Sequence, residues 1–175
     1  VRSQRHTRVT LKDLVGLDSV DQELAEFLSA LVQARKNVMV AGATSAGKTT
    51  LLRALASEIG PDERILTVER SLELGLDGDI DHHPNAIAFE ERLPNTEGAG
   101  AVTMAELVRD TLRMNPSRVI VGEVLGDEVV TMLNAMTQGN DGSLSTIHAN
   151  SSSDVVHKIA TYAIQAPERL PWEAT

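Results

Sequence analysis

A glycine-bounded loop ends in a lysine and a threonine, a combination that can bind phosphate groups. The loop, GATSAGKT, runs from Gly42 to Thr49 and fits the pattern G-x-x-x-x-G-K-[ST]. Successive backbone N–H groups in such a loop form a nest for an anion, and the N-terminus of the following helix adds further donors. In this pattern Lys48 reaches the β- and γ-phosphates of a nucleotide, and the Thr49 hydroxyl binds Mg²⁺. The alternative is an ordinary turn with a solvated lysine.

The residues on either side of the loop favour phosphate binding. An apolar run precedes the loop and a helical pattern follows it, as the motif requires. The sequence contains no Asn-Lys-x-Asp segment, which GTPases usually carry to recognise guanine, so a GTPase is not indicated. The predicted nucleotide-binding residues are Gly42, Ala43, Thr44, Ser45, Ala46, Gly47, Lys48, Thr49 and Thr50.

Glutamates end two other apolar runs and could bind the metal or activate water. Nucleotide hydrolysis needs Mg²⁺ near the phosphates and a carboxylate that positions or deprotonates water. Glu69 and Glu123 are the candidates, and Glu123 is expected at the same sheet edge as Lys48. Thr49 and Glu123 are the predicted metal ligands. The alternative for both acids, and for the nearby Glu73, is a surface glutamate at the end of a strand.

A histidine, His148, ends the last predicted strand. At that position it could sense the γ-phosphate or form a hydrogen bond with a catalytic glutamate. A structural histidine is the alternative, and composition alone favours it.

The acidic segment at 77–83, DGDIDHH, resembles a cation-binding loop but fails the EF-hand pattern. His82 occupies the place of the turn glycine, and Ala88 that of the bidentate glutamate. We expect a solvated loop there.

Strands and helices alternate along the chain. We expect helices over 10–35, 49–59, 103–114, 126–137 and 151–166, and strands over 37–41, 64–69, 118–121 and 143–148, with a further strand at 86–89. The helix starts include capping boxes at Ser19 with Gln22 and at Thr103 with Glu106. The pattern predicts an α/β fold with a mostly parallel sheet and helices on both faces.

The composition limits the function classes. The 175 residues carry a formal net charge of −9, with 2% aromatic residues and no cysteine. Thiolate catalysis and disulfides are excluded. An acidic chain with few aromatic side chains is a poor candidate for binding nucleic acid, and no apolar run approaches the ~18 residues of a membrane span.

Two longer stretches carry a more specific resemblance than the loop alone. TLRMNPSRVIVGE at 111–123 and GNDGSLSTIHAN at 139–150 resemble the type II/type IV secretion ATPase superfamily, and most closely its tight-adherence (Flp pilus) branch. The likeness extends over almost the whole chain. It implies a RecA-like P-loop NTPase core and an ATP-hydrolysing motor for secretion, pilus assembly or conjugative transfer.

The resemblance also assigns roles to individual residues. It makes Glu69 the water-activating or metal-linked acid, Glu123 the acid that supports Mg²⁺ and hydrolysis, and His148 a functional histidine. Arg92 and Arg113 match arginines that the family places near phosphates, within or across subunits.

The sequence departs from the family pattern at two polar positions. Arg70 follows Glu69 where the family usually has aspartate, which reverses a charge beside the proposed base. Asn140 stands where the branch often has histidine.

The resemblance implies a wider organisation as well. Residues 1–35 would be a linker and helical lead-in from a missing N-terminal domain, and 36–175 a motor core truncated at its C-terminus. The implied partners are further copies in a homohexamer and inner-membrane platform components, at the cytoplasmic face of the inner membrane, with no direct nucleic-acid contact. Two alternatives stay open: a nucleic-acid-dependent RecA-like motor, and a non-catalytic scaffold in which Arg70 and Asn140 mark lost activity.

Overall fold

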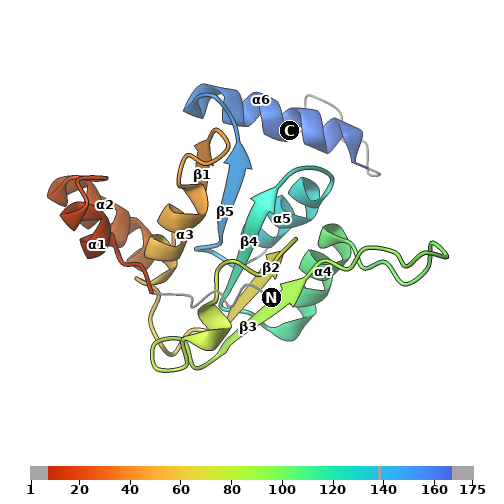
Figure 1. Cartoon of the computed structure of the whole chain (residues 1–175), viewed down its shortest axis with the longest axis horizontal. Helices are drawn as coiled ribbons and strands as arrows, with labels where there is room; N and C mark the ends of the chain where they lie inside the picture. Colours follow the sequence, from red (N-terminus) through yellow and green to blue (C-terminus); the bar gives the residue numbers. More distant parts are fainter. Residues whose placement is uncertain (1–7, 138, 167–175) are drawn as a thin grey trace.

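A five-stranded parallel sheet forms the centre of the computed structural model, which describes residues 8–137 and 139–166 (Figure 1). The strand order is β1-β5-β4-β2-β3, and every pairing between these strands is parallel. The strands are β1 (Val38–Gly42), β2 (Ile65–Glu69), β3 (Ala86–Glu90), β4 (Arg118–Val124) and β5 (Leu144–His148). The predicted α/β class is confirmed, and the 86–89 segment is a strand.

The helices follow the predicted alternation with shifted ends. They are α1 (Leu11–Gly16), α2 (Gln22–Gln33), α3 (Lys48–Ala56), α4 (Met104–Thr111), α5 (Glu128–Thr137) and α6 (Ser152–Gln165), with short 3₁₀ turns at Leu76–Gly78 and Leu112–Met114. Among the described residues, no helix is both long and apolar enough to cross a membrane.

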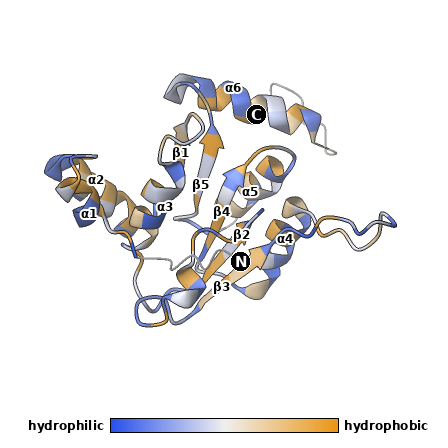
Figure 2. Ribbon diagram, viewed as in Figure 1, coloured by the Kyte–Doolittle hydropathy of each residue, from blue (hydrophilic) through white to orange (hydrophobic). Residues whose placement is uncertain are grey.

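Two apolar clusters cover the two faces of the sheet. Hydrophobic residues run along the central strands, as Figure 2 shows. In β4, Ile120 belongs to the cluster that includes residues of α1, α2 and α3, whereas Val119 and Val121 belong to the cluster that includes residues of α4, α5 and α6. This alternation places consecutive side chains on opposite faces, so a strand covered on both sides reads as a continuous apolar run.

Residues of the N-terminal helices share a core with the sheet. Leu11 and Leu14 of α1 and Val32 of α2 belong to the same buried cluster as Leu52 of α3. The proposed division into a lead-in and a motor core therefore stays a prediction, but the lead-in helices pack on that core.

The helix caps agree with the sequence in one case and differ in another. Thr103 and Glu106 form the predicted capping box at α4. The predicted box at Ser19 is wrong, because Asp21 caps α2 by accepting a hydrogen bond from the Leu24 amide. A capping box at Thr10 and Asp13 starts the short α1. Ser19 and Asp21 are both residue types that cap helices, so the sequence allows either one to start α2. The turn between α1 and α2 places Asp21 at the cap.

Candidate functional site

The phosphate-binding loop joins β1 to α3 and has the backbone conformation that its glycines and small residues permit. Gly47 precedes the helix with φ 84°, and Ser45 has φ 61°. A Cβ atom at Gly42 would lie 3.2 Å from the Cβ of Ala46 and 3.5 Å from the Cγ of Lys48. Glycine at position 42 therefore allows the loop to fold back closely over the end of β1.

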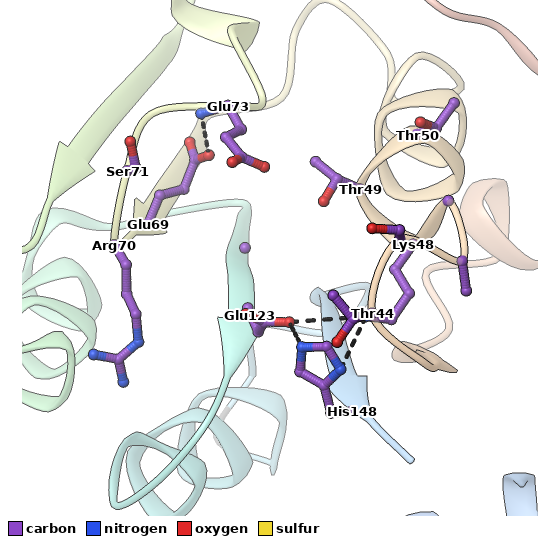
Figure 3. Close-up of a pocket in the computed structure, with 14 residues that line it drawn as sticks. Thr44, Lys48, Thr49, Thr50, Glu69, Arg70, Ser71, Glu73, Glu123 and His148 are labelled. Atoms are coloured by element: carbon purple, nitrogen blue, oxygen red, sulfur yellow. Dashed lines mark hydrogen bonds and ion pairs between the residues drawn. The ribbon is translucent and has the colours of Figure 1, made fainter. Parts of the chain in front are cut away.

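A pocket of about 510 Å³ opens at the carboxyl edge of the sheet. Its lining includes the loop and first helical turn from Thr44 to Thr50, residues after β2, and Glu123 and His148 (Figure 3). Gly42 and Ala43 instead line an adjoining hollow against α6. The structure thus brings together the loop, both candidate acids and the histidine at the edge where parallel sheets bind ligands.

Lys48, Glu123 and His148 form a connected polar group in this pocket. The His148 Nε2 lies 2.8 Å from the Glu123 Oε1, and its Nδ1 lies 3.3 Å from the Lys48 Nζ. The Lys48 Nζ is 3.9 Å from the Glu123 Oε1 and donates to the Ala43 carbonyl at 3.0 Å. Because an ammonium group only donates, this arrangement fits a His148 whose Nδ1 accepts and whose Nε2–H donates to Glu123.

Glu69 is more buried than Glu73 or Glu123, with 2% of its surface exposed. Its Oε2 accepts hydrogen bonds from the backbone amides of Glu73 and Leu74, and its Oε1 accepts one from the Thr67 hydroxyl. Burial raises the pKa of Glu69, and these hydrogen bonds offset part of that effect. Glu69 therefore shapes the loop after β2 as well as lining the pocket.

Gly122 explains the gap in the apolar run before Glu123. A Cβ atom at this position would lie 3.0 Å from the Glu69 Cγ. The register between β4 and β5 also shifts between Val121 and Val124. A glycine beside this irregularity leaves room for the Glu69 side chain of the neighbouring strand.

Glu73 lines the pocket, although the predicted set of site residues did not include it. Its carboxylate and the Thr49 hydroxyl point toward one another in Figure 3. The sequence signal was present, since Glu73 lies four residues after Glu69. The loop that carries it is irregular, so spacing alone did not tell which way its side chain points.

Arg70 turns away from the phosphate-binding loop (Figure 3). Its guanidinium pairs with Glu91 at 2.7 Å and with Glu128 at 3.2 Å. The reversed charge beside Glu69 is therefore balanced by two carboxylates on other segments.

Arg92 does not line the pocket in this chain. It follows β3 and forms an isolated antiparallel bridge with Val102, at the base of an extended loop (Figure 1). Its Nε donates to the Gly100 carbonyl at 2.5 Å, and a Cβ atom at Gly100 would meet its Nη2. The role of Arg92 near phosphate stays a prediction, and within one chain the structure gives it a local contact.

Arg113 also lies outside the pocket. It belongs to the 3₁₀ turn Leu112–Met114, has 74% of its side chain exposed, and pairs with Asp110 at 3.2 Å. Its role near phosphate, within or across subunits, stays a prediction.

The remaining polar segments take local roles. Asp79 pairs with His82 at 2.7 Å, and the described part of the chain holds no group of three or more acidic, histidine or cysteine side chains placed for a metal. The Asn140 carbonyl accepts a hydrogen bond from the Ser143 hydroxyl in the turn before β5.

Comparison with known proteins identifies relatives over nearly the whole chain. The family model described as "Type II/IV secretion system protein" matches residues 1–168. A putative conjugal transfer protein of Mycobacterium tuberculosis is 42% identical over 156 residues, covering 87% of this chain and 43% of that protein. The type IV secretion system protein VirB11 of Brucella suis is 33% identical over 181 residues, covering 97% and 48%.

Solved structures agree with the fold. The crystal structure of the Brucella suis VirB11 ATPase, in complex with sulphate, has a TM-score of 0.75 at 31% identity and covers 98% of this chain and 48% of that one. The Legionella pneumophila ATPase DotB, at 23% identity and a TM-score of 0.66, covers 93% and 42% and supports the fold alone.

The chain spans less than half the length of these relatives. Their names include secretion, conjugal transfer and ATPase proteins, and the narrower likeness to the tight-adherence branch stays a prediction. The chain has the RecA-like P-loop fold of these ATPases and belongs to the type II/IV secretion system protein family.

Proposed function

We propose that this chain is the ATP-hydrolysing core of a motor for secretion, pilus assembly or conjugative transfer. The observation that carries the proposal is the convergence of Lys48, Glu123 and His148 beside a complete phosphate-binding loop. Relatives named as secretion ATPases support the same reaction class.

The residues of the loop would hold the nucleotide. The backbone from Gly42 to Thr49 and the N-terminus of α3 supply N–H donors for the phosphates. Lys48 now contacts Glu123, His148 and a carbonyl of its own loop, so it is already directed into the pocket. These existing partners hold its ammonium group in place for a phosphate oxygen.

The donor set in the pocket also fits Mg²⁺. The metal prefers oxygen ligands, and the Thr49 hydroxyl with the Glu73 and Glu123 carboxylates line one pocket. When bound there, Mg²⁺ would neutralise charge on the phosphates. Thr49 and Glu123 are the proposed ligands, and Glu73 is an additional one on the ground that it faces Thr49 (Figure 3).

Glu69 and His148 are assigned to proton transfer and sensing. A carboxylate whose pKa is raised by burial is a better base near neutral pH than an exposed one. We assign the water-activating role to Glu69. The His148 imidazole contacts both Lys48 and Glu123. When Lys48 moves to bind a phosphate, His148 would transmit that movement to Glu123, and this is the sensing role that we assign to it.

The proposed setting is a ring of subunits at the cytoplasmic face of the inner membrane. Family membership and the names of the secretion-system relatives support this. Arg92 and Arg113, which lie outside the pocket of their own chain, are proposed to reach the nucleotide of a neighbouring copy. Inner-membrane platform components are the proposed further partners.

ATP hydrolysis by the natural full-length protein tests the proposal. Lys48→Ala removes the phosphate contact and is expected to abolish ATP binding or turnover. Glu123→Gln keeps the shape of the side chain but removes its charge, so ATP binding should persist while turnover falls, on the order of 10²-fold or more. Wild-type hydrolysis in both variants would exclude this site.

Matched controls and two further measurements separate the alternatives. Lys36→Ala, at the exposed opposite end of β1, should leave turnover unchanged. Stimulation of hydrolysis by single-stranded DNA would indicate a nucleic-acid motor. Tight ATP binding by the assembled protein without phosphate release would indicate a non-catalytic scaffold.

A further inference from the structure

Arg70 connects three segments that the sequence keeps far apart. Its own position directly follows Glu69 at the end of β2. Its Nη1 lies 2.7 Å from Glu91, the residue after β3, and its Nη2 lies 3.2 Å from the Oε1 of Glu128, in the first turn of α5. One planar guanidinium thus bridges two carboxylates, which a lysine ammonium cannot reproduce with the same geometry.

Glu128 is an unusual partner because it is completely buried. Its Oε1 also accepts a hydrogen bond from the Leu125 amide at 2.6 Å, whereas its Oε2 has no hydrogen-bond partner in the described structure. Arg70 is the cation paired with it among the residues described. A buried carboxylate without a cation is strongly unfavourable, so the position of Glu128 depends on Arg70.

The bridge joins the segments that follow the two strands carrying the proposed catalytic acids, Glu69 in β2 and Glu123 in β4. Glu69 precedes Arg70, and the loop that follows donates its Glu73 and Leu74 amides to the Glu69 carboxylate. On the other side, the Leu125 amide that binds Glu128 lies two residues after Glu123. Glu69 is therefore connected to Glu123 through its neighbour Arg70, the Arg70–Glu128 ion pair and the Leu125 amide that donates to Glu128.

We propose that Arg70 is a positioning residue for ATP hydrolysis. By binding Glu91 and Glu128 together, it fixes the loop after β2 against the loop after β4, and so fixes the positions of Glu69 and Glu123, which lie at the carboxyl ends of the strands before these loops. The arginine thus gives this chain a structural link at the position of its departure from the family pattern, not a mark of lost activity. The inference rests on the proposed function of this site.

Three variants of the natural full-length protein test it. Arg70→Met removes the charge but keeps a long side chain. Glu128→Gln removes the charge that Arg70 balances, and the Leu125 amide can still donate to the amide oxygen. The double variant Arg70→Met/Glu128→Gln has neither charge. Arg35→Met is the matched control, since Arg35 is similarly exposed and pairs with Glu63 at 2.7 Å, at the opposite end of the strands.

We expect Arg70→Met to lower kcat on the order of tenfold with KM for ATP nearly unchanged, because the phosphate-binding loop is untouched. Its Tm should also fall, since Glu128 loses its cation. The double variant should recover Tm, because no buried charge is left unpaired, but kcat should stay low, because the bridge is not rebuilt. Recovery of both Tm and kcat would overturn the proposal and leave Arg70 a purely structural counter-charge.

Hydrogen exchange supplies a readout that does not need turnover. In Arg70→Met, peptides covering 70–76 and 123–128 should exchange faster than in Arg35→Met or the wild type. Unchanged exchange would overturn the positioning role even if the protein hydrolyses ATP. Faster exchange in a protein without ATPase activity would support the link and refute only the proposed function.

Discussion

At the scale of a single residue, burial and hydrogen bonding act on the Glu69 carboxylate in opposite directions: burial disfavours its charged form, and the amide hydrogen bonds favour it. This carboxylate is buried, which raises its pKa, yet it holds the backbone of the loop after β2 through two amide hydrogen bonds. A folded-state pKa above the ordinary value means that the folded state binds the proton more tightly than the unfolded state. The stability contributed by this group is fully present below the ordinary carboxyl pKa and is lost as pH rises through the raised pKa.

A Glu69→Gln variant separates the structural role from the chemical one. The amide oxygen can still accept from the backbone amides, and no charge is left in a buried place. The free energy of unfolding at neutral pH should therefore be equal to or higher than that of the wild type, while ATP turnover is lost if Glu69 is the base. Urea unfolding and ATPase assays of the same preparation check both. Full turnover at wild-type stability would remove Glu69 from the chemistry.

At the scale of the element, the carboxyl end of β4 accommodates the Glu69 side chain of the neighbouring strand β2. The apolar half of β4 is buried on both faces, and its carboxyl end contains Gly122 and Glu123, which lie within the register shift between Val121 and Val124. Because Gly122 has no side chain, Glu69 packs closely over it, and the carboxyl ends of β4 and β2 form a single packed unit.

Gly122→Ala should disturb that unit. The added Cβ would lie 3.0 Å from the Glu69 Cγ, so Glu69 or β4 must move, and we expect a loss of about 1–3 kcal/mol in the free energy of unfolding. ATP turnover should fall further than stability alone explains, since the displaced group is the proposed base.

Gly16→Ala is the control for this comparison. Gly16 ends α1, and a Cβ atom there meets nothing within 4 Å. Stability should be unchanged or slightly higher because alanine restricts the unfolded chain. If Gly122→Ala and Gly16→Ala have the same free energy of unfolding and the same ATP turnover, the close packing of β4 against Glu69 contributes to neither stability nor activity.

At the scale of the whole molecule, one arginine binds several segments together at the amino ends of the strands, opposite the pocket. Arg118 is 1% exposed and binds both oxygens of Glu63, at 2.7 and 2.8 Å. It also donates to the Val32 carbonyl at the end of α2 and to the Gly142 carbonyl before β5. Segments from the start, middle and end of the chain therefore depend on one guanidinium.

Arg118→Met should be strongly destabilising, with a loss of about 3 kcal/mol or more in the free energy of unfolding, because buried carbonyls and a carboxylate lose their donor. Arg35→Met, which removes the more exposed partner of Glu63, should cost about 1 kcal/mol or less. Urea denaturation at neutral pH measures both losses. Equal losses would show that burial of the Arg118 contacts does not increase their contribution to stability.

The same network predicts a dependence on pH. Burial acts to raise the pKa of Glu63, but hydrogen bonds and charge from Arg118 and Arg35 outweigh it and lower the pKa. This stabilisation is present above the ordinary carboxylate pKa and is lost as pH falls through the lowered value. The loss of stability on acidification should be smaller in Arg118→Met. If the free energy of unfolding falls equally with decreasing pH in the variant and the wild type, the role of Glu63 is contradicted.

Local patterns in the sequence determined much of this molecule. The phosphate-binding loop, the alternation of strands and helices and the capping box at Thr103 each depend on residues within a few positions of one another. Short-range backbone geometry and side-chain periodicity act in the same way in any α/β protein, so these features could be predicted. The convergence of Lys48, Glu123 and His148 followed too, because the carboxyl ends of parallel strands share one edge.

Tertiary structure decided the features that depend on distant partners. Arg70 turns toward Glu91 and Glu128, which lie 21 and 58 residues away along the chain. Glu73 faces Thr49, whereas Arg92 and Arg113 stay out of the pocket of their own chain. The direction of a long polar side chain is set by the carboxylates, carbonyls and burial that the fold brings within reach, and one-dimensional spacing does not specify these. The sequence by itself thus determined the family and the position of the site, and the fold decided which side chains meet there.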